Sequence, residues 1–108
     1  MPRSQTILRY IVLISFKPGV LSDIREKVYR HYQTLGEKCG GKKAGILDWR
    51  VEHNLDLRKG VHLVEVAVFK NNKSLQTYRR HPAHVDFVEN LVRHVADWQV
   101  GALYEPAP

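Results

Sequence analysis

The sequence predicts an α+β sandwich, in which an antiparallel four-stranded sheet carries helices on one face. Two observations predict it. Segments of strand-like composition and segments with helical spacing of apolar residues follow one another in the order βαββααβ. The chain has 108 residues, with no linker and no low-complexity stretch to divide it. We therefore expect residues 1–108 to form a single domain.

Four segments have the composition of strands. Ile7–Phe16 is rich in β-branched and aromatic residues. Ile46–Val51 and Val61–Phe69 flank a polar turn at 54–60 that ends in glycine, which favours a hairpin. Trp98–Tyr104 is the last strand candidate. All four are expected to belong to one sheet.

Three segments are expected to be helical. Apolar residues recur at helical spacing over 21–35, and this helix should end near the glycine at position 36. A second, short helix should end near Arg80, because the ring of Pro82 disfavours the α conformation at His81. Pro82 suits the first turn of a third helix, which reaches Val95. This order of elements is typical of a ferredoxin-like sandwich.

The strands predict two different sheet faces. We expect one face to meet the helices and to include Tyr10, Val12 and Ile14 together with His62 and Val64. The opposite face is then apolar and bare, with Ile11, Leu13, Leu63, Ala67 and Phe69. An apolar patch of that size is larger than soluble monomers usually expose. A second copy of the chain is therefore the expected partner, as a homodimer through this sheet face.

Composition limits the other partners. The net charge is +6, but the basic residues are interleaved with acids and form no aromatic-studded stripe. This distribution argues against specific nucleic-acid binding, although the positive net charge should attract anionic small ligands. The single cysteine, Cys39, excludes an internal disulfide and fits a reducing cytoplasm. No apolar run is long enough to span a membrane, so a cytoplasmic protein without membrane contact is expected. We expect disorder at Met1–Gln5 and at Glu105–Pro108.

The residues with the most chemical potential surround Pro82. A phenol, Tyr78, and two imidazoles, His81 and His84, lie within seven positions of one another. The helix break should let Tyr78 and His84 converge, whereas His81 is expected to hold the joint itself. Because Pro82 separates the two histidines and no carboxylate completes a ligand set, no metal site and no cofactor are expected.

This stretch resembles the stress-responsive A/B-barrel (Dabb) family. The resemblance rests on Tyr78 followed by the run 81–87, on the strand residues 62–66, and on the opening strand 11–17. It implies a homodimeric α+β barrel. The family includes polyketide cyclases that use a tyrosine and a histidine at the positions of Tyr78 and His84. The resemblance also implies that His62 is a pocket histidine, whereas Tyr10 occupies a position where those cyclases carry another histidine.

These inferences define the candidate site. His84 and Tyr78 are the candidate catalytic pair, as base and hydrogen-bond donor. The candidate ligand-binding residues are His62, Tyr10, Tyr32, Phe87 and Trp98. Such a site fits a small, largely apolar organic ligand and cofactor-free acid–base chemistry. The alternatives are a non-catalytic structural or interaction dimer with a filled core, and a monooxygenase of the same superfold. An open cavity that reaches His84 would separate the first reading from the structural one.

Overall fold

The computed structural model describes residues 6–107, and the expectations for Met1–Gln5 and for Pro108 lie outside these residues. The strands are β1 (Thr6–Phe16), β2 (Ile46–His53), β3 (Leu63–Phe69) and β4 (Ala96–Pro106). The α-helices are α1 (Ser22–Gln33), α2 (Leu35–Lys38), α3 (Asn72–Arg80), α4 (Pro82–Phe87) and α5 (Arg93–Val95). A 3₁₀ turn, η1 (Gly41–Ala44), and a π-helical turn, η2 (Val88–Val92), complete the chain.

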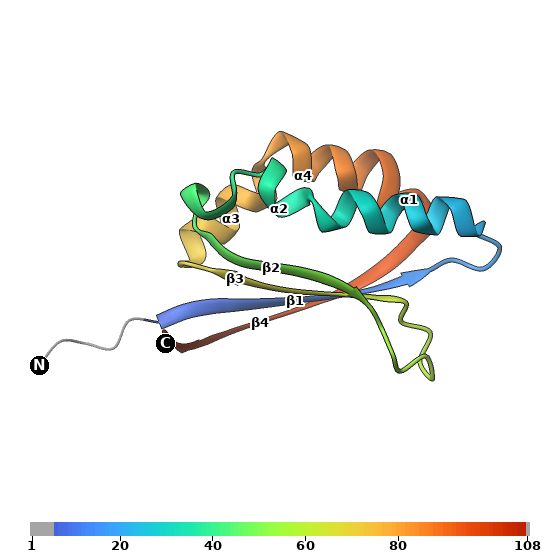
Figure 1. Cartoon of the computed structure of the whole chain (residues 1–108), viewed down its shortest axis with the longest axis horizontal. Coiled ribbons are helices and arrows are strands. Elements are labelled where there is room, and N and C mark those ends of the chain that lie inside the picture. Colours follow the sequence, from blue (N-terminus) through green and yellow to red (C-terminus); the bar gives the residue numbers. More distant parts are fainter. Residues whose placement is uncertain (1–5, 108) are drawn as a thin grey trace, which may run out of the picture.

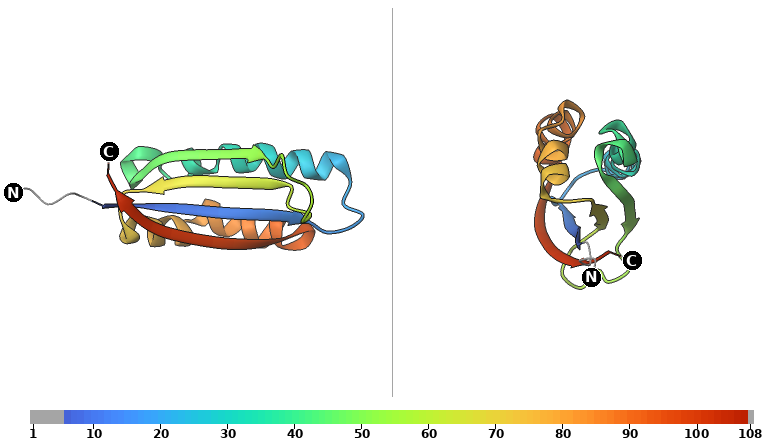
Figure 2. Two further views of the ribbon diagram at one scale, coloured as in Figure 1. Left: turned by 90° about the horizontal axis from the view of Figure 1, so that it is seen from below. Right: turned by 90° about the vertical axis from the view of Figure 1, so that its left-hand side faces the viewer.

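The four strands form one antiparallel sheet in the order β2-β3-β1-β4. All helices lie on the same face of the sheet (Figure 1). Viewed end-on, they form two rows, with α1 above the β2 edge and α3 and α4 above the β4 edge (Figure 2). The expected α+β sandwich with a four-stranded antiparallel sheet is therefore confirmed.

The register between β1 and β3 corrects the expected faces of β3. Val12 of β1 pairs with Glu65, and the neighbouring pairs are Tyr10 with Ala67 and Ile14 with Leu63. Directly paired residues point to the same side of a sheet. Glu65, and the residues two positions before and after it, therefore face the helices. The prediction that Leu63, Ala67 and Phe69 lie on the bare face is wrong, since all three are fully buried.

The bare face is formed by the residues that alternate with these. Ile11 and Leu13 lie there as expected, and their partners across the strand pair are Val66 and Val64. All four are only partly buried in the single chain. The physical reason for the error is that both faces of β3 are apolar, so alternation alone does not say which side meets the helices.

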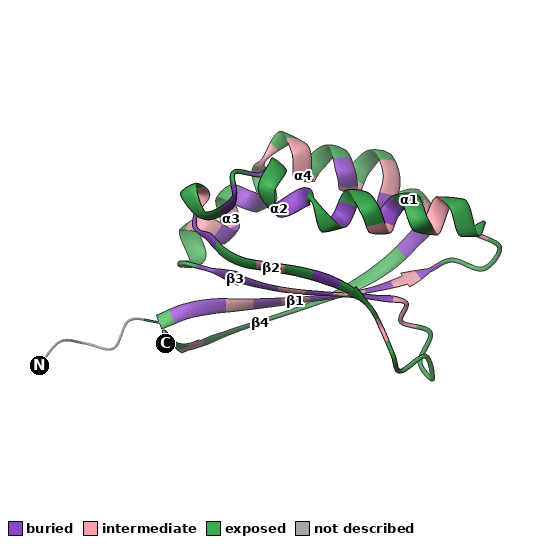
Figure 3. Ribbon diagram, in the orientation of Figure 1, coloured by how far each residue is buried: buried purple, intermediate pink, exposed green. Residues whose placement is uncertain are grey.

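The buried residues of the core lie where the helices meet the sheet (Figure 3). One close approach there requires glycine: a Cβ on Gly36 of α2 would lie 2.6 Å from Cγ of Trp49. The indole of Trp49 in turn donates from Nε1 to the carbonyl oxygen of Tyr32, at 3.0 Å. This hydrogen bond joins the end of α1 to β2 and satisfies a carbonyl group at the helix end.

The joint between α3 and α4 has the expected construction. Asn71 caps the start of α3, where its side chain accepts a hydrogen bond from the Ser74 backbone N–H. His81 has an extended backbone and separates the two helices, and its Nδ1 accepts from the Ala83 backbone N–H at 3.0 Å. Pro82 is the first residue of α4. The helix then continues through η2 and α5 to the start of β4.

The C-terminal end of the sheet differs from expectation. Glu105 was expected to be disordered, but it pairs with Ile7 in the β1–β4 ladder. Its carboxylate accepts a hydrogen bond from Nε of Arg9 at 2.8 Å. The strand therefore continues to Pro106, because pairing with the long β1 satisfies backbone groups that composition alone leaves unassigned. Among residues 6–107, no helix is both long and apolar enough to cross a membrane.

Candidate functional site

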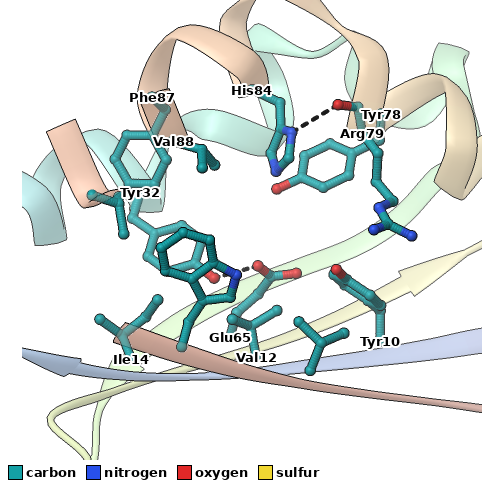
Figure 4. Close-up of a pocket in the computed structure, with 13 residues that line it drawn as sticks. Tyr10, Val12, Ile14, Tyr32, Glu65, Tyr78, Arg79, His84, Phe87 and Val88 are labelled. Carbon is teal, nitrogen blue, oxygen red and sulfur yellow. Dashed lines mark hydrogen bonds between the residues drawn. The ribbon is translucent and has the colours of Figure 1, made fainter. Parts of the chain in front are cut away.

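A cavity of about 270 Å³ separates the sheet from the helical layer (Figure 4). For comparison, a cavity of roughly 150 Å³ holds benzene, so this one has room for an aromatic ring with short substituents. The interior is therefore not filled, contrary to the premise of the structural alternative. The lining residues are Tyr10, Val12, Ile14, Tyr32, Glu65, Tyr78, Arg79, His84, Phe87, Val88, Val92, Trp98 and Val100.

His84 hangs from the first turn of α4 into the cavity (Figure 4). Its Nδ1 lies 3.0 Å from the carbonyl oxygen of Arg79, across the helix joint. A carbonyl oxygen only accepts, so Nδ1 carries the proton and Nε2 of the neutral ring keeps its lone pair. Burial lowers the pKa of His84, and the nearby charges of Arg79 and His81 lower it further, against the opposing effect of the carbonyl. The imidazole is therefore neutral near pH 7, with a free basic nitrogen.

Tyr78 closes the last turn of α3 and lies beside His84, with 4.4 Å between the ring centroids. Its ring also packs against Phe69 and Trp49, at 5.3 and 5.5 Å. Burial raises the pKa of Tyr78 well above its ordinary value, so the phenol stays protonated. Its hydroxyl points into the cavity (Figure 4), and none of the hydrogen bonds within residues 6–107 uses it.

Glu65 is the site residue that the sequence did not predict. It projects from the middle of β3 into the cavity and is only 1% exposed. The hydroxyl of Tyr32 donates a hydrogen bond to Oε1, while Oε2 is buried and has no partner among the described residues. Burial raises the pKa of Glu65 to about 8, although the bond from Tyr32 opposes this. The available signal was a single acid in an otherwise apolar strand, Leu63–Phe69.

Two further polar groups line the cavity. Tyr10 of β1 is buried and packs edge-on against Phe69, with the centroids 5.9 Å apart. Burial raises the pKa of Tyr10, and the charge of Glu65 raises it further. Arg79 is exposed and also lines the cavity, so its guanidinium is the only permanent charge among the lining residues. Sequence reasoning did not single out Arg79 for this place.

Aromatic walls enclose the rest of the cavity. Phe87 of α4 packs against Tyr32, with 5.2 Å between the ring centroids. Trp98 lines the cavity from β4, where it pairs with Ile14. Since Trp98 is 40% exposed and its neighbour Val100 is 52% exposed, the cavity reaches the surface along β4. The structure thus brings together the predicted aromatic residues.

His62 is not part of this cavity, and its expected place there is wrong. It precedes β3, and its Nδ1 accepts a hydrogen bond from the Phe16 backbone N–H at 3.0 Å. The two rings are 5.4 Å apart. Burial lowers the pKa of His62, and Arg25 lowers it further. His62 lies just before the start of β3, beside Arg25 and Glu26 of α1, and not among the residues that line the cavity.

The cysteine does not line the cavity, although it lies close to the backbone of His84. Cys39 is buried, and burial raises the pKa of its thiol to about 11, so the reactive thiolate is scarce near neutral pH. Across residues 6–107, no cluster of three or more histidine, cysteine or acidic side chains is suitable for holding a metal ion.

Solved structures resemble this chain over nearly its whole length. A Dabb family protein with a ferredoxin-like fold from Mesorhizobium loti has a TM-score of 0.74 at 14% identity, and the match covers 96% of this chain and 99% of that one. A dimeric protein with a ferredoxin-like fold from Bacteroides fragilis has a TM-score of 0.72 at 17% identity, with coverages of 94% and 96%. The hydroxynitrile lyase from Passiflora edulis has a TM-score of 0.76 at 14% identity, with coverages of 94% and 95%.

At these identities the likeness shows the fold alone. No curated protein sequence matches the chain. The model of the stress-responsive A/B barrel domain family, however, matches residues 8–101, which include β2, β3, every helix and parts of β1 and β4. The chain therefore belongs to the stress-responsive A/B barrel (Dabb) domain family.

Proposed function

We propose that this protein is a homodimer that binds a small, largely apolar organic ligand and acts on it by cofactor-free acid–base chemistry. The observation that carries the proposal is the cavity itself. It is lined mainly by apolar side chains, and it receives the imidazole of His84 and the hydroxyl of Tyr78 at one end. A few convergent polar groups in an apolar pocket are typical of small-molecule sites.

His84 is the proposed base. The carbonyl of Arg79 holds the proton on Nδ1, which leaves Nε2 as the acceptor. The lowered pKa keeps the ring neutral and ready to accept a proton at neutral pH. Tyr78 is the proposed donor, because its phenol stays protonated and its hydroxyl is directed into the cavity.

The reaction that suits these groups is removal of a proton from carbon next to a carbonyl group. Nε2 of His84 takes the proton, and the electron pair of the broken C–H bond forms a carbon–carbon double bond. The carbonyl π electrons move to oxygen, which becomes an enolate. The hydroxyl of Tyr78 stabilises that negative oxygen by a hydrogen bond. Aldol-type ring closure or simple proton exchange then follows from the same enolate.

The fold is compatible with an enzyme. The Passiflora edulis protein that shares it over 94% of this chain is a hydroxynitrile lyase. At 14% identity the shared feature is the fold, and the activity of that protein supports a catalytic use of the same architecture here.

The proposed dimer uses the bare face of the sheet. Ile11, Leu13, Val64 and Val66 form an apolar strip on this face and are only partly buried in one chain. Similar folds from Bacteroides fragilis and Thermobifida fusca are described as dimeric. Pairing of two such strips around a two-fold axis would remove the apolar surface from water.

Phenylacetone is a suitable probe of the chemistry, because its ring suits the cavity volume and its methylene protons lie next to a carbonyl. We expect the protein to accelerate exchange of these protons with deuterium in D₂O, followed by proton NMR. His84→Ala should reduce this acceleration by about 100-fold or more, the usual contribution of a positioned base. His94→Ala is the matched control, since His94 is exposed on α5 and lies outside the cavity.

Circular dichroism and thermal unfolding of each variant establish that the fold is retained. If His84→Ala stays folded and exchanges the probe as fast as the parent protein, His84 is not the base. If the parent protein binds phenylacetone without any acceleration, the site is a binding site only.

A further inference from the structure

Glu65 has a carboxyl group that is only half satisfied by the protein. Oε1 accepts the hydrogen bond from Tyr32, whereas Oε2 is buried without a partner among the described residues. An unsatisfied buried polar atom is destabilising, so it needs an explanation. The carboxyl group lies in the middle of the cavity floor, opposite His84 (Figure 4).

Glu65 has no positively charged partner among the described residues. Among the ion pairs of residues 6–107, none includes Glu65. The titratable or charged groups that surround the cavity with it are Tyr10 of β1, Tyr32 of α1, Tyr78 and Arg79 of α3, and His84 of α4. The three phenols stay protonated and His84 is neutral, so only the exposed Arg79 bears a charge. Burial accordingly favours the neutral carboxylic acid.

The hydrogen bond from Tyr32 decides where the acid proton resides. Oε1 already accepts from the Tyr32 hydroxyl, so the proton of the neutral acid belongs to Oε2. Oε2–H is then a donor beside the cavity that Glu65 lines, and it has no acceptor among the described residues. An apolar pocket that keeps a carboxylic acid neutral makes it a strong hydrogen-bond donor to a ligand oxygen.

We propose that Glu65 is a second ligand-contacting donor, whose Oε2–H binds the carbonyl oxygen of the ligand, and that the site therefore takes ketones or related carbonyl compounds. This inference rests on the proposed function and names its substrate class. In the ground state Oε2–H holds the carbonyl oxygen while Nε2 of His84 faces the adjacent carbon. When His84 takes the proton, negative charge develops on the carbonyl oxygen. The hydrogen bonds from Glu65 and Tyr78 both stabilise this charge, and both become stronger as it develops.

Two probes and two variants test the inference. Phenylacetone carries the carbonyl oxygen, and propylbenzene lacks only that oxygen. Glu65→Gln keeps an acceptor for Tyr32 and an N–H donor at the cavity. Glu65→Leu removes the donor and replaces it with an apolar side chain of similar size. Affinities are measured by NMR titration, and the infrared carbonyl stretch of bound ¹³C-labelled phenylacetone reports the hydrogen bond directly.

We expect Glu65→Leu to bind phenylacetone about tenfold more weakly than the parent protein, which is the usual value of one neutral hydrogen bond. Propylbenzene should bind parent and Glu65→Leu within about twofold of each other, since it makes no use of the donor. The carbonyl stretch should move to lower frequency in the parent protein and in Glu65→Gln, but not in Glu65→Leu.

The result that overturns the inference is an equal effect of Glu65→Leu on both probes, or an unshifted carbonyl stretch in the parent complex. Either result leaves the binding cavity and the roles of His84 and Tyr78 intact. Failure of both probes to bind the parent protein would instead overturn the proposed function, and the role of Glu65 with it. Should Glu65→Leu not fold, the size of the carbonyl shift decides: a carboxylic acid is a stronger donor than an amide N–H, so the shift should be smaller in Glu65→Gln than in the parent protein, and equal shifts would overturn the inference.

Discussion

Glu65→Gln should change how the stability of this protein depends on pH. Glu65 has a pKa of about 8 in the folded chain, against 4.5 for an ordinary glutamate. The folded state therefore holds this proton over a pH range in which the unfolded state has lost it. Stability from Glu65 is fully present below pH 4.5, and it is lost progressively as the pH rises toward 8.

The magnitude follows from the two pKa values. Each pH unit between them removes about 1.4 kcal/mol of unfolding free energy, so the loss approaches about 5 kcal/mol near pH 8 or above. Glutamine does not titrate, so Glu65→Gln lacks this loss. A typical domain is stable by only about 5–15 kcal/mol, and an effect of this size is therefore easy to measure.

The assay is urea denaturation of both proteins between pH 4.5 and 9, at one protein concentration. All other titrating groups, including His84, are common to both proteins, so the difference between the two unfolding free energies isolates Glu65. We expect this difference to shift in favour of Glu65→Gln as the pH rises. A difference that stays constant with pH would refute the reasoning, because Glu65 would then have the same pKa in both states.

Two further predictions concern the fold and the assembly. Gly45→Ala should lower the unfolding free energy by about 2–3 kcal/mol, because φ is +84° and the new Cβ would collide with Ser74 Oγ. Gly19→Ala, with φ of +81° and open space around it, should lose only about 1 kcal/mol; equal losses in urea denaturation would exclude the collision. Leu13→Arg on the bare sheet face should convert a dimer to a monomer in light scattering, whereas Gln33→Arg on the exposed face of α1 should not. A parent protein that is monomeric, or a Leu13→Arg variant that remains dimeric, would contradict the proposed interface.

Much of the fold was predictable because the responsible signals are local. Helical spacing of apolar residues identified α1, and the ring of Pro82 determined where α3 ends and α4 begins. The His81 joint follows from the same local chemistry. The convergence of Tyr78 and His84 could also be anticipated, since six positions and one helix break separate them.

The faces of β3 could not be predicted in this way. Residues on both sides of this strand are apolar, and a one-residue change of face moves every side chain to the other layer. The prediction therefore placed His62 in the cavity and Leu63 on the bare face, whereas Leu63 pairs with Ile14 and is buried under the helices, and His62 lies outside the cavity. A charged residue is also expected to avoid the interior, so the sequence pattern does not predict Glu65 in the cavity.

The sequence by itself thus determined the family, the order of elements and most residues that line the cavity, because these depend on spacing along the chain. Only the tertiary structure decided that Glu65 joins them and that His62 does not. The pairing of β3 with β1 sets that choice, and it depends on how two strands about 50 residues apart align in space. The half-satisfied carboxyl group, and the carbonyl ligand inferred from it, follow from that register.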